Sequence, residues 1–110
     1  MEQKEALELL SDGHTIVAPE RAEEVCRLAG VAFDRAKLVQ RWRSDPPGTA
    51  KGLQMAPGQE NTEGVYSLTL GYYLAEQLQL GTPGGAFNGR GFQARANADA
   101  IAVKLGWRTV

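Results

Sequence analysis

The sequence contains very little cysteine and histidine. Cys26 is the only cysteine and His14 the only histidine among 110 residues. A single cysteine cannot form a disulfide within the chain, which fits a reducing compartment. No His/Cys cluster has the spacing of metal ligands, and no nucleophile is tied to His14 by its position in the sequence. We therefore predict no metal, no cofactor and no catalytic residue, and a binding protein rather than an enzyme.

The sequence also lacks a long hydrophobic run. Its first ten residues, MEQKEALELL, contain no apolar segment of signal-peptide length. No stretch approaches the roughly 20 apolar residues that a membrane-spanning helix needs. We therefore expect no membrane partner and a cytoplasmic location. The hydrophobic fraction of 43% is nevertheless that of a globular protein, and the length fits one domain, residues 1–110, with a core of its own.

The sequence has no large excess of charge of either sign, since the formal net charge is -1. That balance argues against a protein that is basic over its whole surface. The charges are nevertheless unevenly distributed: acidic side chains outnumber basic ones seven to two in residues 1–24, and basic side chains outnumber acidic ones four to one in both 31–43 and 81–110. An acidic first part and a basic second part can pair within one molecule or between two.

Hydrophobic periodicity predicts a mainly α fold, a small bundle of about five helices. Apolar residues recur at helical spacing in residues 2–11, 19–29, 33–43, 71–80 and 92–105. Gly13, Gly30 and Gly106 follow three of these segments, where a left-handed cap ends a helix, and Pro19 suits the first turn of the second. Its predicted buried residues are Ala22, Val25, Cys26 and Ala29.

Two structures compete for residues 52–70. The segments GLQMA (52–56) and VYSLTL (65–70) resemble the strands of a hairpin, because the second is rich in β-branched and aromatic residues. Alternatively, a helix extends over residues 62–80, because Leu70, Tyr73, Leu74 and Leu78 keep helical spacing despite Gly71. The sequence favours a helix over 71–80 and leaves 63–70 open.

The segment EEVCRLAGVAFDRAKLVQRW (23–42) resembles the helix-turn-helix of MerR-like regulators. A small residue, Cys26, precedes the corner glycine, Gly30, by four positions, and the apolar Val31 follows it. The resemblance implies that the helix at 33–43 reads the major groove of DNA, with the basic residues Arg35, Lys37, Arg41 and Arg43. Ala32 departs from the usual serine or threonine cap, and Asp34 would face phosphate. An ordinary αα-hairpin follows the same pattern.

A glycine-rich stretch, GGAFNGRG (84–91), opens the last predicted helix. Exposed backbone amides at a helix N-terminus can hold a phosphate or carboxylate, and the corresponding site would comprise Gly89, Arg90 and Gly91. No Lys-Ser or Lys-Thr follows, so the P-loop pattern is incomplete. A plain loop is the alternative.

Large aromatic side chains predict a surface for self-association. Tyr72 and Tyr73 are adjacent, so they cannot share one helix face, and one of them is exposed or covered by a second subunit. Aromatic residues are enriched at protein interfaces. The function predicted first is therefore a non-enzymatic, homodimer-forming helical module, with an interface containing Tyr66, Tyr72, Tyr73 and Phe92. DNA binding and anion binding are the two alternatives.

Overall fold

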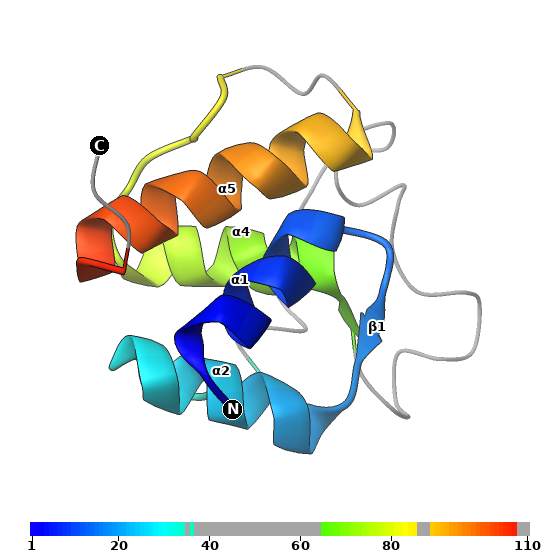
Figure 1. Ribbon diagram of the computed structural model, residues 1–110, viewed down its shortest axis with the longest axis vertical. Helices are drawn as coiled ribbons and strands as arrows, with labels where there is room; N and C mark the ends of the chain where they lie inside the picture. Colours follow the sequence, from blue (N-terminus) through cyan, green and yellow to red (C-terminus); the bar gives the residue numbers. More distant parts are fainter. Residues whose placement is uncertain (35, 37–64, 86–88, 108–110) are drawn as a thin grey trace.

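A computed structural model describes residues 1–34, 36, 65–85 and 89–107 of the chain. This part contains four helices, α1 (Gln3–Asp12), α2 (Pro19–Ala29), α4 (Ser67–Gln77) and α5 (Arg90–Leu105), and two short strands, β1 (Ile16–Val17) and β2 (Val65–Tyr66) (Figure 1). The mainly helical prediction is confirmed. The predicted count of five helices is not matched in this part, and the helix expected at 33–43 lies almost wholly outside the described residues.

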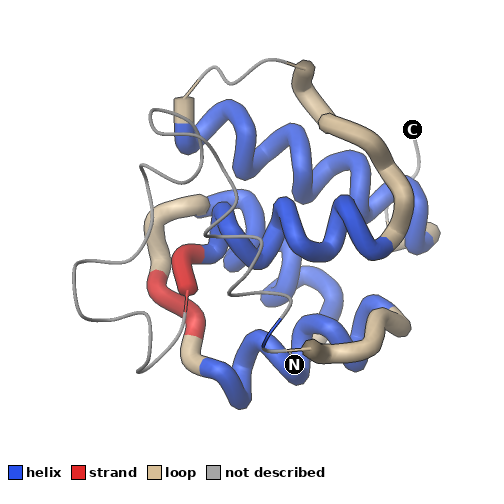
Figure 2. The backbone as a smooth tube through the Cα atoms, turned by 180° about the vertical axis from the view of Figure 1, so that it is seen from behind, coloured by secondary structure: helices blue, strands red, loops and turns tan. Residues whose placement is uncertain are grey.

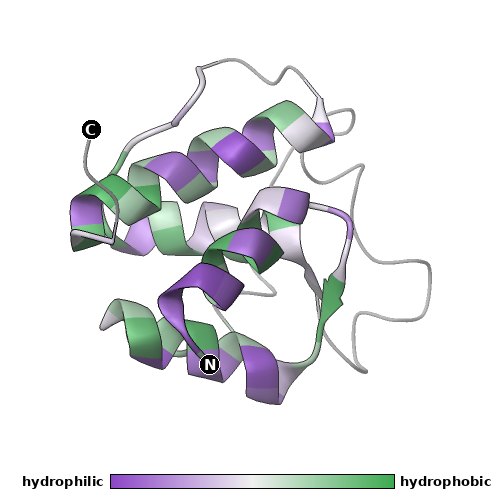
Figure 3. Cartoon of the chain, in the orientation of Figure 1, coloured by the Kyte–Doolittle hydropathy of each residue, from purple (hydrophilic) through white to green (hydrophobic). Residues whose placement is uncertain are grey.

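The bounds of α1 and α2 follow from their end residues. Gly13 ends α1 with a left-handed backbone, φ 78°, and Pro19 starts α2. At the end of α2, Gly30 has φ 72°; its N–H donates to the Arg27 carbonyl at 3.1 Å, and the Val31 N–H donates to the Cys26 carbonyl at 2.9 Å. This pair of hydrogen bonds is the Schellman motif, which satisfies carbonyls that the helix leaves without partners. Polar and apolar segments alternate along both helices, as in amphipathic helices (Figure 3).

The structure decides between the two alternatives left open for residues 65–70: a helix begins at Ser67, after a strand of two residues. Only Val65 and Tyr66 are extended, and they pair antiparallel with Val17 and Ile16 respectively (Figure 2). The chain becomes helical at Ser67, whose N–H donates to the Thr15 carbonyl at 2.7 Å. The first strand of the expected hairpin, 52–56, lies outside the described residues. Ser67 and Thr69 are polar but buried like Leu68 and Leu70, so the alternation of polar and apolar residues here does not mark an exposed face, and periodicity cannot separate helix from strand.

Helix α4 ends three residues earlier than expected, at Gln77. Gln79 occupies the left-handed position, with φ 59°, and is the only non-glycine residue of the described part with positive φ. The Leu80 N–H donates to the Ala75 carbonyl at 2.9 Å, so this end also forms a Schellman motif.

We expect Gln79→Gly to stabilise the fold by up to about 1 kcal/mol. A left-handed backbone costs a residue with a β-carbon roughly 1–2 kcal/mol, and glycine avoids that cost while losing more entropy on folding. Gln79 is exposed, so its side chain contributes little packing. Urea unfolding monitored by circular dichroism measures the change. Gln77→Gly, inside the last turn of α4, should destabilise instead, and an equal effect of both substitutions would contradict the assignment.

The core is organised around α4. Every residue from Ser67 to Ala75 except Tyr72 is buried, and α4 packs against both α1 and α5, which also contact each other. Helix α2 contributes its predicted buried face, including Cys26, which is fully buried. Trp107, just beyond α5, is partly buried and packs on the core. The largest fully buried apolar side chains are Tyr73, Leu10, Leu68, Leu70, Leu74, Ile101, Val17 and Val25.

Helices α1 and α5 run in opposite directions and touch where α1 ends (Figure 1). A β-carbon on Gly13 would lie 2.8 Å from the Ala94 β-carbon and 3.3 Å from the Arg90 carbonyl oxygen. Real β-carbons do not approach other atoms this closely, so the contact requires glycine at position 13. Gly13 therefore serves both as the cap of α1 and as the point where α5 docks.

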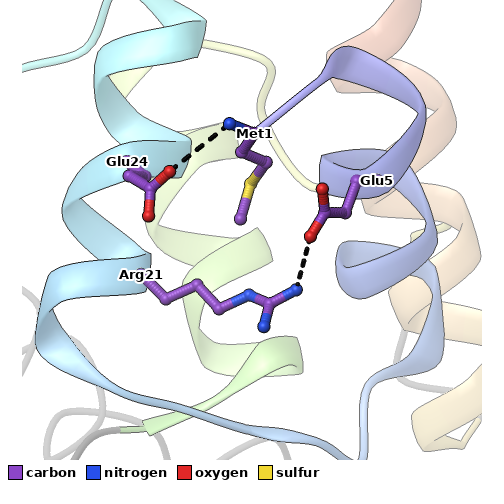
Figure 4. A network of polar contacts seen from close by, with 4 residues as sticks. All are labelled: Met1, Glu5, Arg21 and Glu24. Carbon is purple, nitrogen blue, oxygen red and sulfur yellow. Dashed lines mark hydrogen bonds and ion pairs between the residues drawn. The ribbon is translucent and has the colours of Figure 1, made fainter.

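Ion pairs join α1 to α2 at the surface (Figure 4). Arg21 of α2 contacts Glu5 of α1 at 2.9 Å, and the N-terminal amine of Met1 contacts Glu24 at 3.5 Å. The Arg21 and Glu5 side chains are about half exposed, and such surface pairs contribute roughly 0–1 kcal/mol. The burial of apolar residues therefore holds the two helices together. Within the described residues, no helix is long and apolar enough to cross a membrane.

Candidate functional site

The outward face of α5 carries two large apolar side chains in solvent. Phe92 is 45% exposed and Val103 is 42% exposed. They lie eleven residues apart, close to three helical turns, so they share one face. Ala96 and Asp99 lie between them at steps of four, three and four, the spacing of a coiled-coil seam. We call these four residues, Phe92, Ala96, Asp99 and Val103, the α5 outer face.

The opposite side of α5 anchors the helix in the fold. Its buried residues are Gln93, Ala94, Asn97, Ala98, Ile101 and Ala102. The C-terminal end is closed by Gly106, φ 76°, and by the Trp107 N–H, which donates to the Ala102 carbonyl at 2.8 Å. The core side and the C-terminal end of α5 are therefore held by the fold, and the α5 outer face lies on the side that is left.

The residues preceding α5 pack beside this face. A β-carbon on Gly84, which has φ 79°, would lie 3.0 Å from the Ala96 β-carbon and 3.2 Å from Phe92 Cε1. Gly84 thus borders the α5 outer face without covering Phe92, which remains 45% exposed. Residues 86–88 of the predicted anion-binding loop lie outside the described part of the chain.

The predicted anion-binding residues are placed around the first turn of α5. Gly89 has φ 109° and precedes the helix, with no side-chain cap. The Arg90 guanidinium lies over the Tyr66 ring, 4.5 Å from its centroid, and Arg90 Nη1 lies 3.3 Å from His14 Nδ1. Arginine only donates hydrogen bonds, so Nδ1 of His14 is the acceptor in this contact. Arg90 is therefore engaged with Tyr66 and His14, and anion binding at this turn stays a prediction.

The four predicted interface residues fall into different environments. Tyr66 is half-buried under Arg90, and Tyr72 is half-buried, with its hydroxyl donating to Gln93 Oε1 at 3.3 Å. Phe92 alone is widely exposed. Phe92 is therefore the one of the four whose side chain is largely in solvent, and the interface itself stays a prediction.

Tyr73 requires a correction, because its side chain is only 1% exposed. Its hydroxyl donates to the Ala32 carbonyl at 2.8 Å and accepts from the Asp34 N–H at 3.2 Å. Burial raises the pKa of the Tyr73 phenol. Tyr73 is thus a core residue that fastens the chain after α2 to α4, and it offers no surface to a partner.

The corner at residues 26–31 has the local geometry that the helix-turn-helix pattern requires. Cys26 is fully buried, Gly30 is left-handed, and Val31 packs against the core. The predicted DNA-contacting residues, Arg35, Lys37, Arg41 and Arg43, all lie outside the described residues. DNA binding therefore stays a prediction.

Burial controls the chemistry of Cys26. Desolvation, with a smaller contribution from the Glu23 carboxylate, raises the pKa of the thiol from 9.0 to about 11. The thiolate is the reactive form of cysteine, so the buried, neutral Cys26 is expected to be inert in the native state. Its role is packing at the corner rather than catalysis.

We expect stability to fall between about pH 9 and pH 11 because of Cys26. The folded-state pKa is the higher one, so the unfolded chain releases its proton first, and the contribution is full below pH 9 and lost as pH rises. A shift of this size corresponds to about 3 kcal/mol. About half of this, roughly 1.3 kcal/mol, should be lost between pH 8 and pH 10. Urea unfolding at these two pH values measures the loss, with Cys26→Ala as comparison. An equally steep loss in Cys26→Ala would contradict the prediction, since only the Tyr73 contribution should remain.

A groove runs between α1 and α5. It is open to solvent, has a volume of about 750 Å³ and is lined mainly by Lys4, Leu7, Glu8 and Asp12 of α1, by Arg95 of α5 and by Trp107. These residues are about ninety positions apart in the sequence, so no local pattern signals them. The only hint was the opposite charge of the two ends of the chain.

The described residues contain no group of three or more histidine, cysteine, aspartate or glutamate side chains placed to hold a metal ion. Comparison of the chain with protein-family models, with curated proteins and with solved structures finds no match. The surfaces described above are therefore the basis on which a function can be inferred.

Proposed function

We propose that this protein is a self-associating helical module in which the α5 outer face of one copy pairs with the same face of a second copy. The observation that carries the proposal is the exposure of both Phe92 and Val103 on one face of a helix whose other side is buried. Burying such side chains contributes roughly 1.5–3 kcal/mol each relative to leaving them in water. Pairing with an identical face supplies a matching surface at both positions.

An antiparallel arrangement fits the residues of this face. With the two-fold axis between residues 97 and 98, Phe92 of one copy lies against the partner's Val103. The same arrangement places Asp99 beside the partner's Arg95, twice across the interface, so the charges are complementary. Ala96 already contacts Gly84 of its own chain, so the two copies meet chiefly at Phe92, Asp99 and Val103. A parallel arrangement would instead place Asp99 beside Asp99, which is repulsive.

The area of contact predicts a weak dimer. A helix of 16 residues is about 24 Å long, and one such helix pair buries less than the 1,200–2,000 Å² of a stable complex. We therefore expect a dissociation constant in the micromolar range or above, and a monomer–dimer equilibrium that depends on concentration.

Phe92→Asp is expected to make the protein monomeric at every accessible concentration, because it places a charge opposite the partner's Val103. Sedimentation equilibrium over a wide concentration range measures the effect. Ile16→Asp is the matched control, since Ile16 is 44% exposed and lies on β1, away from α5. Dimerisation that survives Phe92→Asp, or that fails equally in Ile16→Asp, would remove the support for this interface.

A charge exchange tests the antiparallel geometry directly. Arg95→Glu and Asp99→Arg should each weaken self-association by about tenfold, because each creates two like-charged contacts across the interface. An equimolar mixture of the two variants should form a heterodimer, because the introduced glutamate of one copy then faces the introduced arginine of the other, and the native Asp99 faces the native Arg95. Circular dichroism confirms that each variant is folded. A mixture that remains monomeric would show that the copies do not pair in this register.

A further inference from the structure

The groove between α1 and α5 has the composition of a recognition site. Its apolar part is formed by Leu7 and Trp107, and charged side chains stand along both of its sides. Trp107 is held in place by its backbone hydrogen bond to Ala102 and by packing on the core. Tryptophan and arginine are the residue types that contribute most often to binding energy at protein interfaces.

The charges along the groove are largely unused by the fold. Among the described residues, Lys4, Glu8 and Arg95 have no ion-pair or hydrogen-bond partner. Asp12 differs, because its carboxylate accepts a hydrogen bond from the Thr15 hydroxyl. Within the described part of the chain, the groove therefore presents the unpaired cations Lys4 and Arg95 and the unpaired carboxylate of Glu8 to a ligand, beside the Asp12 carboxylate, which keeps its charge. Arg95 is shared with the proposed dimer, in which it faces the partner's Asp99, so the peptide and the partner copy compete for this one side chain.

The two cations stand on opposite walls and at opposite ends. Lys4 lies near the start of α1. Arg95 lies beside Ala94, which meets Gly13 at the end of α1, so Arg95 is level with Ser11 and Asp12. The rise of a helix places these two levels roughly 10 Å apart along the groove. An extended peptide covers that distance in about three residues, and side chains three positions apart point to opposite sides.

We propose that the α1–α5 groove binds an extended peptide segment of a partner protein, with acidic residues at positions i and i+3 and apolar residues between them. One acidic side chain pairs with Lys4 and the other with Arg95. The apolar side chains rest on Leu7 and Trp107, and the Glu8 carboxylate accepts a backbone N–H of the peptide. An open groove along a helix suits a chain lying lengthwise, whereas small molecules prefer enclosed pockets.

The test uses the blocked peptide acetyl-Glu-Leu-Leu-Glu-amide and the full-length protein carrying Trp42→Phe, in which Trp107 is the only tryptophan. We expect saturable quenching or shift of Trp107 fluorescence with sub-millimolar affinity. Acetyl-Gln-Leu-Leu-Gln-amide should bind at least tenfold more weakly. Free glutamate is the comparison for a simple carboxylate; binding of glutamate as tight as that of the peptide would overturn the peptide assignment.

Variants locate the site and separate it from self-association. Lys4→Glu should weaken peptide binding at least tenfold without changing the monomer–dimer equilibrium, because Lys4 lies outside the α5 outer face. Lys104→Glu is the matched control, an exposed cation on α5 that does not line the groove, and it should leave binding unchanged. Absence of peptide binding, or equal binding to Lys4→Glu and the unmodified groove, would overturn the proposal and leave the proposed dimer unaffected.

Discussion

Replacing Gly13 by alanine is expected to destabilise the protein by about 3 kcal/mol. Two costs add at this position. A left-handed backbone costs an alanine roughly 1–2 kcal/mol, and Gly13 has φ 78°. The new β-carbon would also lie 2.8 Å from the Ala94 β-carbon, and forced overpacking costs typically 1–3 kcal/mol. The result is a strained junction between the end of α1 and the start of α5.

Gly30→Ala separates the two costs. Gly30 has φ 72° and also ends a helix, but a β-carbon there would meet no atom within 4 Å. This variant should therefore lose only about 1 kcal/mol. Thermal unfolding measures both, and a loss of 3 kcal/mol corresponds to a midpoint lower by roughly 10–15 °C in a domain of this size. Equal losses of stability in the two variants would show that the close approach of Gly13 to Ala94 does not add to the cost of the Gly13→Ala substitution.

Asn97→Leu is expected to stabilise the protein by about 2 kcal/mol. Asn97 is fully buried between α4 and α5, and neither its Oδ1 nor its Nδ2 has a hydrogen-bond partner among the described residues. A buried polar group without a partner costs roughly 1–3 kcal/mol. Leucine has a similar shape and removes that cost, although Gly71 lies close to the Asn97 side chain and limits the space.

Gln93→Met is the matched comparison, one turn earlier on the same side of α5. Gln93 is equally buried, but its Oε1 accepts a hydrogen bond from the Tyr72 hydroxyl. Removing it leaves that hydroxyl without its acceptor, so a loss of about 1 kcal/mol is expected. Urea unfolding of both variants gives the comparison. A destabilised Asn97→Leu variant would indicate that the amide makes an interaction, for example through a bound water.

The sequence by itself determined the local elements whose ends carry their own signals. Pro19, Gly13, Gly30 and Gly106 mark helix ends because each needs a backbone geometry that these residues supply alone or best. The buried face of α2 followed from spacing, since one side of that helix is exposed and one is not. The spacing and small side chains of α5 predicted a helix in the same way.

Only the tertiary structure decided how residues far apart in the sequence are used. Residues 67–70 are helical, and the sequence could not predict this because α4 is buried on nearly all sides and its periodicity marks no exposed face. Strand β2 pairs with β1, about fifty residues earlier in the chain. Tyr73 was predicted at an interface and lies in the core, because hydrogen-bond partners at Ala32 and Asp34 satisfy its hydroxyl there. Hydrophobic periodicity shows which side of a helix or strand is apolar, but it does not show which other element packs against that side.

The two proposed surfaces differ in how far the sequence alone indicates them. The helical spacing of the four residues of the α5 outer face can be read from the sequence, but their exposure to solvent is known only from the structure. The groove exists only because α1 and α5 pack in opposite directions, which brings Lys4 to the same cleft as Arg95 and Trp107. That packing includes the close contact between Gly13 and Ala94. Nothing in the sequence around either residue indicates that the two are in contact.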